Sequence, residues 1–294
     1  MACCLSLGAA PEPYLGAFLR SIEPAIDALA VNDNSGLERN PNADVLLRSR
    51  FARQGSLAIV RTRFDGFAKM RADALAAAAR LSMRPEWILY ADADEVHGTQ
   101  LRVIVRDVLP SLSNEVGFVD AYIEHLFGTF GWSTDVGRRI TFFRYGLEVR
   151  WNNLVHERMV RTPGRTTIVL PYVYNHYGNV AALASYAAKN DLYERLAARA
   201  GETVRHREPD AVQAEMIAMV RPYRRRHPLA VLETIEHMRR DDAERLAQTE
   251  YVIRSSRTPL RVLRGSYHAL NDAVRVRLRR LERLGRYRFP ASAR

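Results

Sequence analysis

The chain has 294 residues, of which 47% are hydrophobic and 26% charged, and its formal net charge at pH 7 is +11. This composition predicts one large globular domain or two smaller ones, and it excludes disordered, collagen-like and coiled-coil proteins. The two cysteines are adjacent and cannot build a disulfide framework, and neither a signal peptide nor an apolar run of ~18 residues is recognisable. We therefore expect a cytoplasmic protein.

Short apolar runs alternate with helical patterns in the first hundred residues, which predicts an α/β structure with a mostly parallel sheet. The predicted elements there are strands over 5–7, 28–31, 57–60 and 87–91 and helices over 15–22 and 67–81. Further strands are predicted over 116–123, 140–144, 148–151 and 166–174, with mixed or antiparallel pairing, and a helix over 180–200. We expect one domain over residues 1–200 and a helical, arginine-rich region over 201–294.

Three acidic residues follow the apolar strand 87–91 directly: Asp92, Asp94 and Glu95. Side chains alternate along an extended backbone, so Asp92 and Asp94 are expected to face one side and to share a divalent cation or a diphosphate with its metal. Open α/β sheets bind ligands at the carboxyl ends of their strands, which is where this D-x-D motif falls. The alternative is an ordinary acidic surface turn, although a buried strand rarely leads into three acids without a use for them.

Seven segments, taken in order, carry a resemblance to a known family: LSLGAAPEPYLGAFLRSI, LAVNDNSG, FDGFAKMRADAL, WILYADADE, RRITFFR, VHE and NHYG. Over roughly residues 3–195 the chain resembles a family 2 glycosyltransferase of the GT-A fold. The resemblance implies a Rossmann-like domain with a mostly parallel central sheet and helices on both faces. It also implies a nucleotide-diphosphate sugar as donor, Mn²⁺ or Mg²⁺ as cofactor, and transfer of the sugar with inversion at the anomeric carbon.

The resemblance also implies which residues hold the nucleotide-sugar donor. Asn32 and Asp33 match the turn that binds base and ribose, although many members have an acid where Asn32 stands. Lys69 and Arg71 match basic residues that approach the diphosphate, and Asp92 matches a contact to ribose and metal. For Lys69 and Arg71 the alternative is a solvated helix surface.

Metal binding and proton transfer are implied for four more residues. Asp94 matches the direct metal ligand, and His176 matches the later histidine that completes the metal shell. Glu157 resembles the acid that takes the proton of the acceptor hydroxyl, with His156 orienting it or reaching the metal. A lone histidine is more often structural than ligating, and for His156 and His176 both the structural and the ligating role stay open.

An arginine cluster, Arg138, Arg139 and Arg144, matches basic residues that could stabilise the departing diphosphate.

The basic character of the chain belongs to its C-terminal segment. Residues 251–294 contain twelve arginines against two acids, which is a net charge of +10. Apolar residues recur there at helical spacing, namely Leu263, Tyr267, Leu270, Val274, Leu278 and Leu281. This pattern predicts a basic amphipathic helix that either lies on an anionic membrane surface or packs on the catalytic domain or another subunit.

The sequence thus predicts an inverting glycosyltransferase that moves a sugar from a nucleotide-diphosphate sugar to an acceptor hydroxyl. The expected acceptor is a glycan or a lipid-linked molecule in the synthesis of envelope polysaccharide, lipopolysaccharide or another glycan. One alternative is a non-enzymatic protein that binds nucleic acid or membrane through the basic segment, but this leaves the carboxylates unexplained. A nucleotidyltransferase is another, yet no glycine-rich phosphate loop is found.

Overall fold

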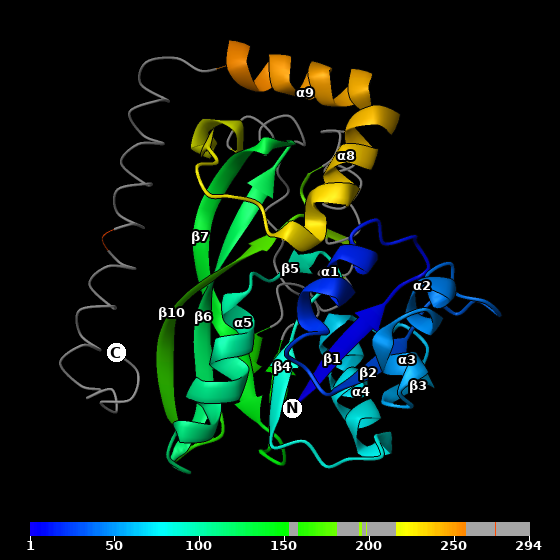
Figure 1. Cartoon of the computed structure of the whole chain (residues 1–294), viewed down its shortest axis with the longest axis vertical. Coiled ribbons are helices and arrows are strands. Elements are labelled where there is room, and N and C mark those ends of the chain that lie inside the picture. The colour runs from blue at the N-terminus through cyan, green and yellow to red at the C-terminus, as the bar shows by residue number, and fades with distance from the viewer. Residues whose placement is uncertain (153–157, 181–193, 196–197, 199–215, 257–273, 275–294) are drawn as a thin grey trace.

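The computed structural model describes residues 1–152, 158–180, 194–195, 198, 216–256 and 274, and a nine-stranded sheet organises this part of the chain (Figure 1). The strand order is β3-β2-β1-β4-β7-β6-β10-β5, and β11 pairs with β7. The strands are β1 (Ala2–Leu7), β2 (Ala28–Asp33), β3 (Leu57–Arg61), β4 (Trp87–Tyr90), β5 (Glu95–Val96), β6 (Val116–Phe127), β7 (Thr129–Arg144), β10 (Thr166–His176) and β11 (Arg221–Pro222). A separate two-stranded sheet joins β8 (Arg150–Asn152) to β9 (Arg158–Val160).

Strands β7 and β5 run antiparallel to their neighbours, and the other strands of the sheet share one direction. The predicted fold class is therefore confirmed: an α/β protein with a mostly parallel central sheet, consistent with a Rossmann-like GT-A fold. Parallel strands need crossover connections, and the amphipathic segments between β1, β2, β3 and β4 supply them as helices.

Helices cover both faces of the sheet because parallel strands must be buried on both sides. The helices are α1 (Leu15–Ile22), α2 (Ala43–Leu47), α3 (Arg50–Arg53), α4 (Phe67–Ala77), α5 (Gln100–Val103), α8 (Leu232–Asp241) and α9 (Ala243–Ser255). On one face, Phe18 and Ile22 of α1 pack in the largest hydrophobic cluster. On the other, Ala74 and Ala77 of α4 pack near the small side chains of Ala28 and its neighbours, which allows a close approach of helix and sheet.

The predicted helix over 67–81 forms as α4, followed by a 3-10 turn at Ala78–Arg80. A π-helical turn at Ile104–Val108 and a 3-10 turn at Leu109–Ser111 continue α5, and another 3-10 turn, Leu229–Val231, precedes α8. Within the described ranges, no helix combines the length and the apolar character that crossing a membrane requires.

Two strands predicted separately join into one long hairpin. Strands β6 and β7 extend beyond 116–123 and 140–144 until they meet at Gly128, whose φ of 69° suits a residue without a side chain. The predicted strand over 148–151 begins later, at Arg150, because Gly146 with a φ of 87° lies in a turn. Phe130 and Trp132 are buried, so this segment packs as core.

Helix α9 packs on the tip of this hairpin. Glu250 of α9 accepts hydrogen bonds from Thr129 Oγ1 at 2.8 Å and from Trp132 Nε1 at 2.7 Å. A Cβ built on Gly128 would lie 2.7 Å from Ile253 Cδ1, so a larger residue at this turn would force the side chain of Ile253 to shift. The predicted helices over 180–200 and 263–281 fall almost entirely outside the described residues.

Candidate functional site

Parallel strands β1, β2 and β4 end at the same edge of the sheet, and predicted site residues lie at the ends of β2 and β4. Asn32 and Asp33 are the last residues of β2, and both are buried. Asp33 Oδ1 accepts hydrogen bonds from Asn40 Nδ2 at 2.7 Å and from Ser35 N at 3.1 Å. Burial alone would raise the pKa of Asp33, but these hydrogen bonds bring it below its ordinary value.

The side chain of Asn32 is satisfied within the protein. Its Nδ2 donates to the carbonyl of Met70 in α4 at 3.3 Å, and its Oδ1 accepts from Thr62 Oγ1 at 2.9 Å. Asn32 therefore joins the end of β2 to the first turn of α4. Arg71 is the residue of α4 that follows Met70. An amide can make both contacts, whereas a carboxylate at this position could not donate to a carbonyl.

The D-x-D segment is a turn, so the expectation that Asp92 and Asp94 face one side of an extended strand is wrong. Strand β4 ends at Tyr90, and the backbone N–H of Glu95 donates to the carbonyl of Asp92 at 3.1 Å. The chain reverses here because Glu95 and Val96 form β5, which pairs antiparallel with the end of β10. As a result the two aspartates face different partners.

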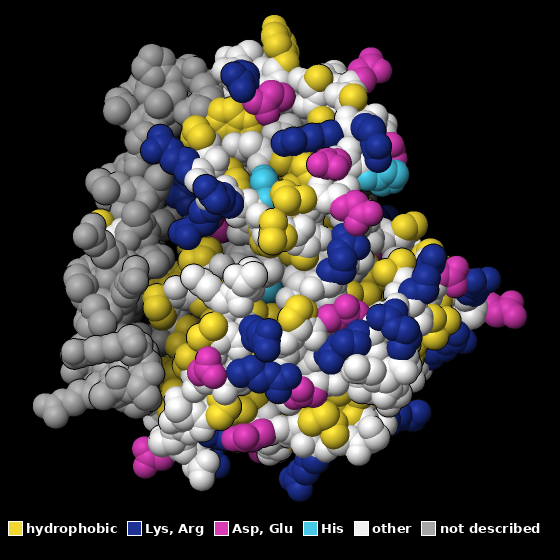
Figure 2. Space-filling model, in the orientation of Figure 1, with side chains coloured by type: hydrophobic (Ala, Val, Ile, Leu, Met, Phe, Trp, Pro, Cys, Tyr) yellow, Lys and Arg dark blue, Asp and Glu magenta, His cyan; other side chains and the backbone are white. Residues whose placement is uncertain are grey.

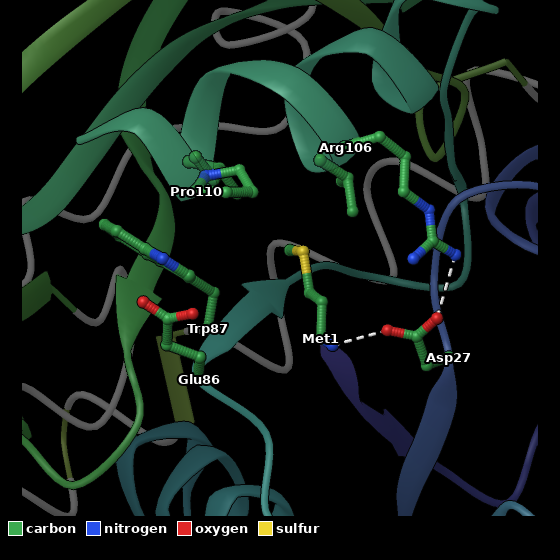
Figure 3. Close-up of a pocket in the computed structure, with 8 residues that line it drawn as sticks. Met1, Asp27, Glu86, Trp87, Arg106 and Pro110 are labelled. Carbon is green, nitrogen blue, oxygen red and sulfur yellow. Dashed lines mark hydrogen bonds and ion pairs between the residues drawn. The ribbon is translucent and has the colours of Figure 1, made fainter.

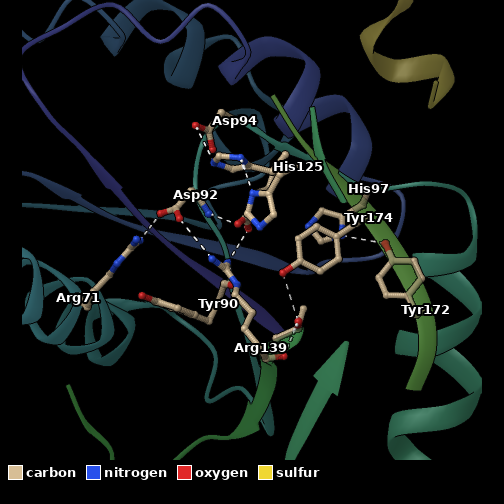
Figure 4. A network of polar contacts seen from close by, with 12 residues as sticks. Arg71, Tyr90, Asp92, Asp94, His97, His125, Arg139, Tyr172 and Tyr174 are labelled. Atoms are coloured by element: carbon tan, nitrogen blue, oxygen red, sulfur yellow. Dashed lines mark hydrogen bonds and ion pairs between the residues drawn. The ribbon is translucent and has the colours of Figure 1, made fainter. Parts of the chain in front are cut away.

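Asp92 lies among arginines. It forms an ion pair with Arg71 of α4, and its Oδ2 lies 3.4 Å from Nη1 of Arg139 on β7 (Figure 4). Burial opposes the ionisation of Asp92, but the two guanidinium groups outweigh it and hold its pKa well below the usual range. Both guanidinium groups also stack over the ring of Tyr90, at 4.9 Å for Arg71 and 5.1 Å for Arg139.

Arg139 also fixes the turn through Glu95. Its Nη2 lies 2.6 Å from Glu95 Oε2 and donates to the carbonyl of Tyr90 at 3.2 Å. The same Oε2 accepts the backbone N–H of Asp92 at 3.1 Å. Glu95 is fully buried, and this burial raises its pKa although Arg139 opposes the shift. The sequence predicts that Arg139 contacts the diphosphate. In the structure its hydrogen bonds to Glu95 and Tyr90 hold the D-x-D turn in place.

Asp94 lies beside His176, which in turn contacts His125. His176, at the end of β10, brings Nε2 to 3.4 Å from Asp94 Oδ2, and its Nδ1 lies 3.1 Å from Nδ1 of His125 on β6. Burial lowers the pKa of His125 to about 4. The loop after β10 closes over Asp94, because Tyr177 N donates to the carbonyl of Asp94 at 2.9 Å. A Cβ on Gly178 would lie 2.0 Å from Asp94 Oδ2, so glycine is needed there.

Asp94 and His176 offer two ligands that a divalent cation bridging to a substrate could use. A carboxylate oxygen and an imidazole nitrogen are ligands that Mn²⁺ accepts, and Mg²⁺ at phosphate sites commonly takes one or two protein ligands. Within the ranges that the structure describes, no group of three His, Cys, Asp or Glu side chains is arranged to hold a metal ion. The remaining ligands would therefore come from the substrate and water.

The remaining predicted site residues have other partners or fall outside the described residues. Lys69 pairs with Asp73 one turn along α4, with Nζ 2.8 Å from the carboxylate. His156 and Glu157 lie outside the described residues. Of the arginine cluster, Arg139 reaches this edge, whereas Arg138 pairs with Asp120 and Arg144 with Glu86.

Sequence reasoning missed His125. It lies near the end of β6, and its partner His176 is 51 residues away. The signal that would have found it is the parallel register of β6 and β10, in which His125 and His176 are directly opposite. No local pattern contains that register.

A cavity of about 200 Å³ lies at the opposite edge of the sheet, where the parallel strands begin (Figure 3). Asp27, which precedes β2, forms ion pairs there with the amino group of Met1 at 2.6 Å and with Arg106 at 2.8 Å. Trp87 and Pro110 line the cavity. None of the predicted site residues lines it.

No protein-family model matches the chain, and no curated protein matches its sequence. Three solved structures are similar to parts of it. A mycobacterial protein is 16% identical over 42% of this chain and 40% of that chain, with a TM-score of 0.30. A 4-diphosphocytidyl-2C-methyl-D-erythritol synthase is 16% identical over 49% of this chain and 75% of that chain, with a TM-score of 0.32. Residues 1–349 of TarS from S. aureus are 11% identical over 91% of both chains, with a TM-score of 0.37.

The chain thus spans less than half of the mycobacterial protein. Likenesses with TM-scores this low carry no argument about activity, so the fold class depends on the sheet of this chain itself.

Proposed function

We propose that the chain is a metal-dependent inverting glycosyltransferase of family 2 that uses a nucleotide-diphosphate sugar as donor. One observation supports this most. At the carboxyl edge of the sheet, the Asp94–His176 pair lies beside Asp92 with its two arginines, so ligands for a cation and guanidinium hydrogen-bond donors lie next to each other. A diphosphate with its cation carries the complementary charges.

In this proposal Asp94 and His176 hold Mn²⁺ or Mg²⁺. When bound, the cation neutralises the charge that develops on the departing nucleoside diphosphate. Asp33, Asn32 and Lys69 contribute to the donor site, as the family resemblance implies. Arg71, held in place by its ion pair with Asp92, contributes guanidinium hydrogen-bond donors to the diphosphate.

Inverting transfer also needs a base for the acceptor hydroxyl. We assign this role to Glu157, with His156 beside it, because Glu157 directly precedes β9 in the segment that resembles the family's acid. The proton of the acceptor hydroxyl moves to the carboxylate as the hydroxyl oxygen attacks the anomeric carbon and the bond from that carbon to the nucleoside diphosphate breaks. We propose a glycan or lipid-linked acceptor at the cytoplasmic face of a membrane, reached through the basic segment.

The first test is thermal stabilisation of the full chain by UDP, GDP, CDP and dTDP, each with and without Mn²⁺. A ligand at about 100 times its Kd stabilises the folded state by about 2.7 kcal/mol. We expect one nucleotide to stabilise the protein in the presence of Mn²⁺, and we expect Asp94→Asn to abolish the effect. Asp107→Asn, an exposed aspartate on the π-helical turn after α5, is the matched control.

The nucleotide that stabilises the protein then selects the sugar donors for a turnover assay. Release of the nucleoside diphosphate, lost in Asp94→Asn and retained in Asp107→Asn, is the expected result. Release of pyrophosphate from the nucleoside triphosphate would instead favour a nucleotidyltransferase. Full turnover by Asp94→Asn would refute the metal assignment.

A further inference from the structure

The contact between His125 and His176 restricts the protonation of both rings. The rings meet edge to face with their centroids 4.9 Å apart, and the two Nδ1 atoms are 3.1 Å apart. In a neutral imidazole one nitrogen donates and the other accepts, so one Nδ1 must carry a proton and the other must not. When both rings are neutral, the hydrogen bond therefore requires opposite tautomers in the two rings.

We propose that His125 is a positioning residue for the cation site: it accepts the Nδ1–H of His176, so that Nε2 of His176 presents its lone pair beside Asp94. This inference rests on the metal site of the proposed function. It follows that His125 carries its own proton on Nε2. Metal-binding histidines almost always donate their second N–H to another group, which fixes the ring and its tautomer.

The surroundings of the two rings support this arrangement. Strands β6 and β10 are paired in register at these positions, so the backbone sets the distance between the rings. Two glycines leave space beside the rings of His125 and His176. A Cβ on Gly137 of β7 would lie 3.4 Å from Nε2 of His125, and a Cβ on Gly178 would lie 3.0 Å from Nε2 of His176.

Two variants of the full chain separate the hydrogen bond from ring packing. His125→Asn places an amide atom where Nδ1 lies and can still accept, whereas His125→Leu fills a similar volume without an acceptor. Mn²⁺ affinity is measured from the electron paramagnetic resonance signal of the free ion. We expect His125→Leu to weaken Mn²⁺ binding ~10-fold or more and His125→Asn to stay within ~3-fold of the natural chain.

A second measurement uses the natural chain and needs no variant to fold. Long-range ¹H–¹⁵N spectra of the imidazoles in the presence of Mg²⁺ report the tautomer of each ring. We expect the Nδ1–H form for His176 and the Nε2–H form for His125. Finding the same tautomer in both rings would overturn the proposal, as would unchanged Mn²⁺ affinity in a folded His125→Leu.

Comparison with Asp94→Asn distinguishes a failure of the role proposed for His125 from a failure of the proposed function. If Asp94→Asn loses Mn²⁺ and His125→Leu does not, the metal site stands and the role of His125 is refuted. If both lose Mn²⁺ but no nucleotide sugar is consumed, the role of His125 stands and the proposed reaction fails. If the natural chain binds no Mn²⁺, both are overturned.

Discussion

At the scale of single residues, the contacts of Asp92 and Asp94 show how one turn separates two carboxylates that the sequence places two positions apart. Asp92 turns toward Arg71 and Arg139, and Asp94 turns toward His176. The two carboxylates thus differ in their nearest partners, although His176 also lowers the pKa of Asp92. The site depends equally on Gly178, whose missing side chain leaves space for Asp94.

We expect Gly178→Ala to abolish the Mn²⁺-dependent stabilisation of the protein while leaving the fold intact. The added methyl group would lie 2.0 Å from Asp94 Oδ2, so the carboxylate or the loop must move away from His176. Thermal unfolding with and without Mn²⁺ measures the effect. Gly98→Ala is the control, since a Cβ there meets nothing within 4 Å. Natural Mn²⁺ affinity in Gly178→Ala would contradict this account.

At the scale of elements, the β6–β7 hairpin connects the site to the C-terminal helices. The second half of β7 carries Arg139 to the D-x-D turn. The start of β7 contacts α9, which lies across this end of the hairpin (Figure 1). Hydrogen bonds to Glu250 hold this contact, and Arg254, Thr129 and Trp132 keep the pKa of Glu250 below its ordinary value against the effect of its partial burial.

We expect Glu250→Ala to lower the free energy of unfolding by about 1–3 kcal/mol, because it leaves Trp132 Nε1 and Thr129 Oγ1 without their acceptor. Urea unfolding at constant pH measures the change. Gln248→Ala, an exposed position on the same helix, is expected to change stability by less than ~0.5 kcal/mol. Equal effects of the two substitutions would show that the Glu250 contacts contribute nothing.

At the scale of the whole molecule, acidic and basic side chains are interspersed over the face shown in Figure 2. Most of the strongly basic segment after residue 256 lies outside the described residues. Inside the molecule, His97 is buried, its Nδ1 lies 2.8 Å from Tyr172 Oη, and its ring stacks on Tyr174 at 4.8 Å. A positive charge on His97 would find no negative partner in this hydrogen bond, so the folded state disfavours protonation of the ring.

This histidine makes stability depend on pH. Burial lowers the pKa of His97 from 6.5 to about 3, so between these values the unfolded chain binds a proton that the folded chain does not. Above pH 6.5 His97 is neutral in both states and does not lower the free energy of unfolding. Below pH 6.5 the free energy of unfolding decreases as the pH falls. Between pH 6 and 4 we expect the unfolding free energy of the natural chain to fall by up to about 1.4 kcal/mol per pH unit more than that of His97→Asn. Parallel curves from urea unfolding would refute this.

The local patterns of the chain were sufficient for its α/β class and for the strands and helices around the candidate site. Burial of β1, β2 and β4 on both faces appears in the sequence as continuous apolar runs, and α1 and α4 appear as helical spacing. These signals are local, because each depends on neighbours within a few turns. For the same reason the sequence placed Asp92 and Asp94 correctly at the end of a strand.

Tertiary contacts decided what those residues face. The reversal after β4, the partnership of Arg139 with Glu95, and the pairing of His125 with His176 all depend on register between strands that are distant in sequence. A shift of one residue in such a register turns a side chain to the opposite face of the sheet. Register is set by the packing of the whole sheet, so no local pattern of this sequence contains it.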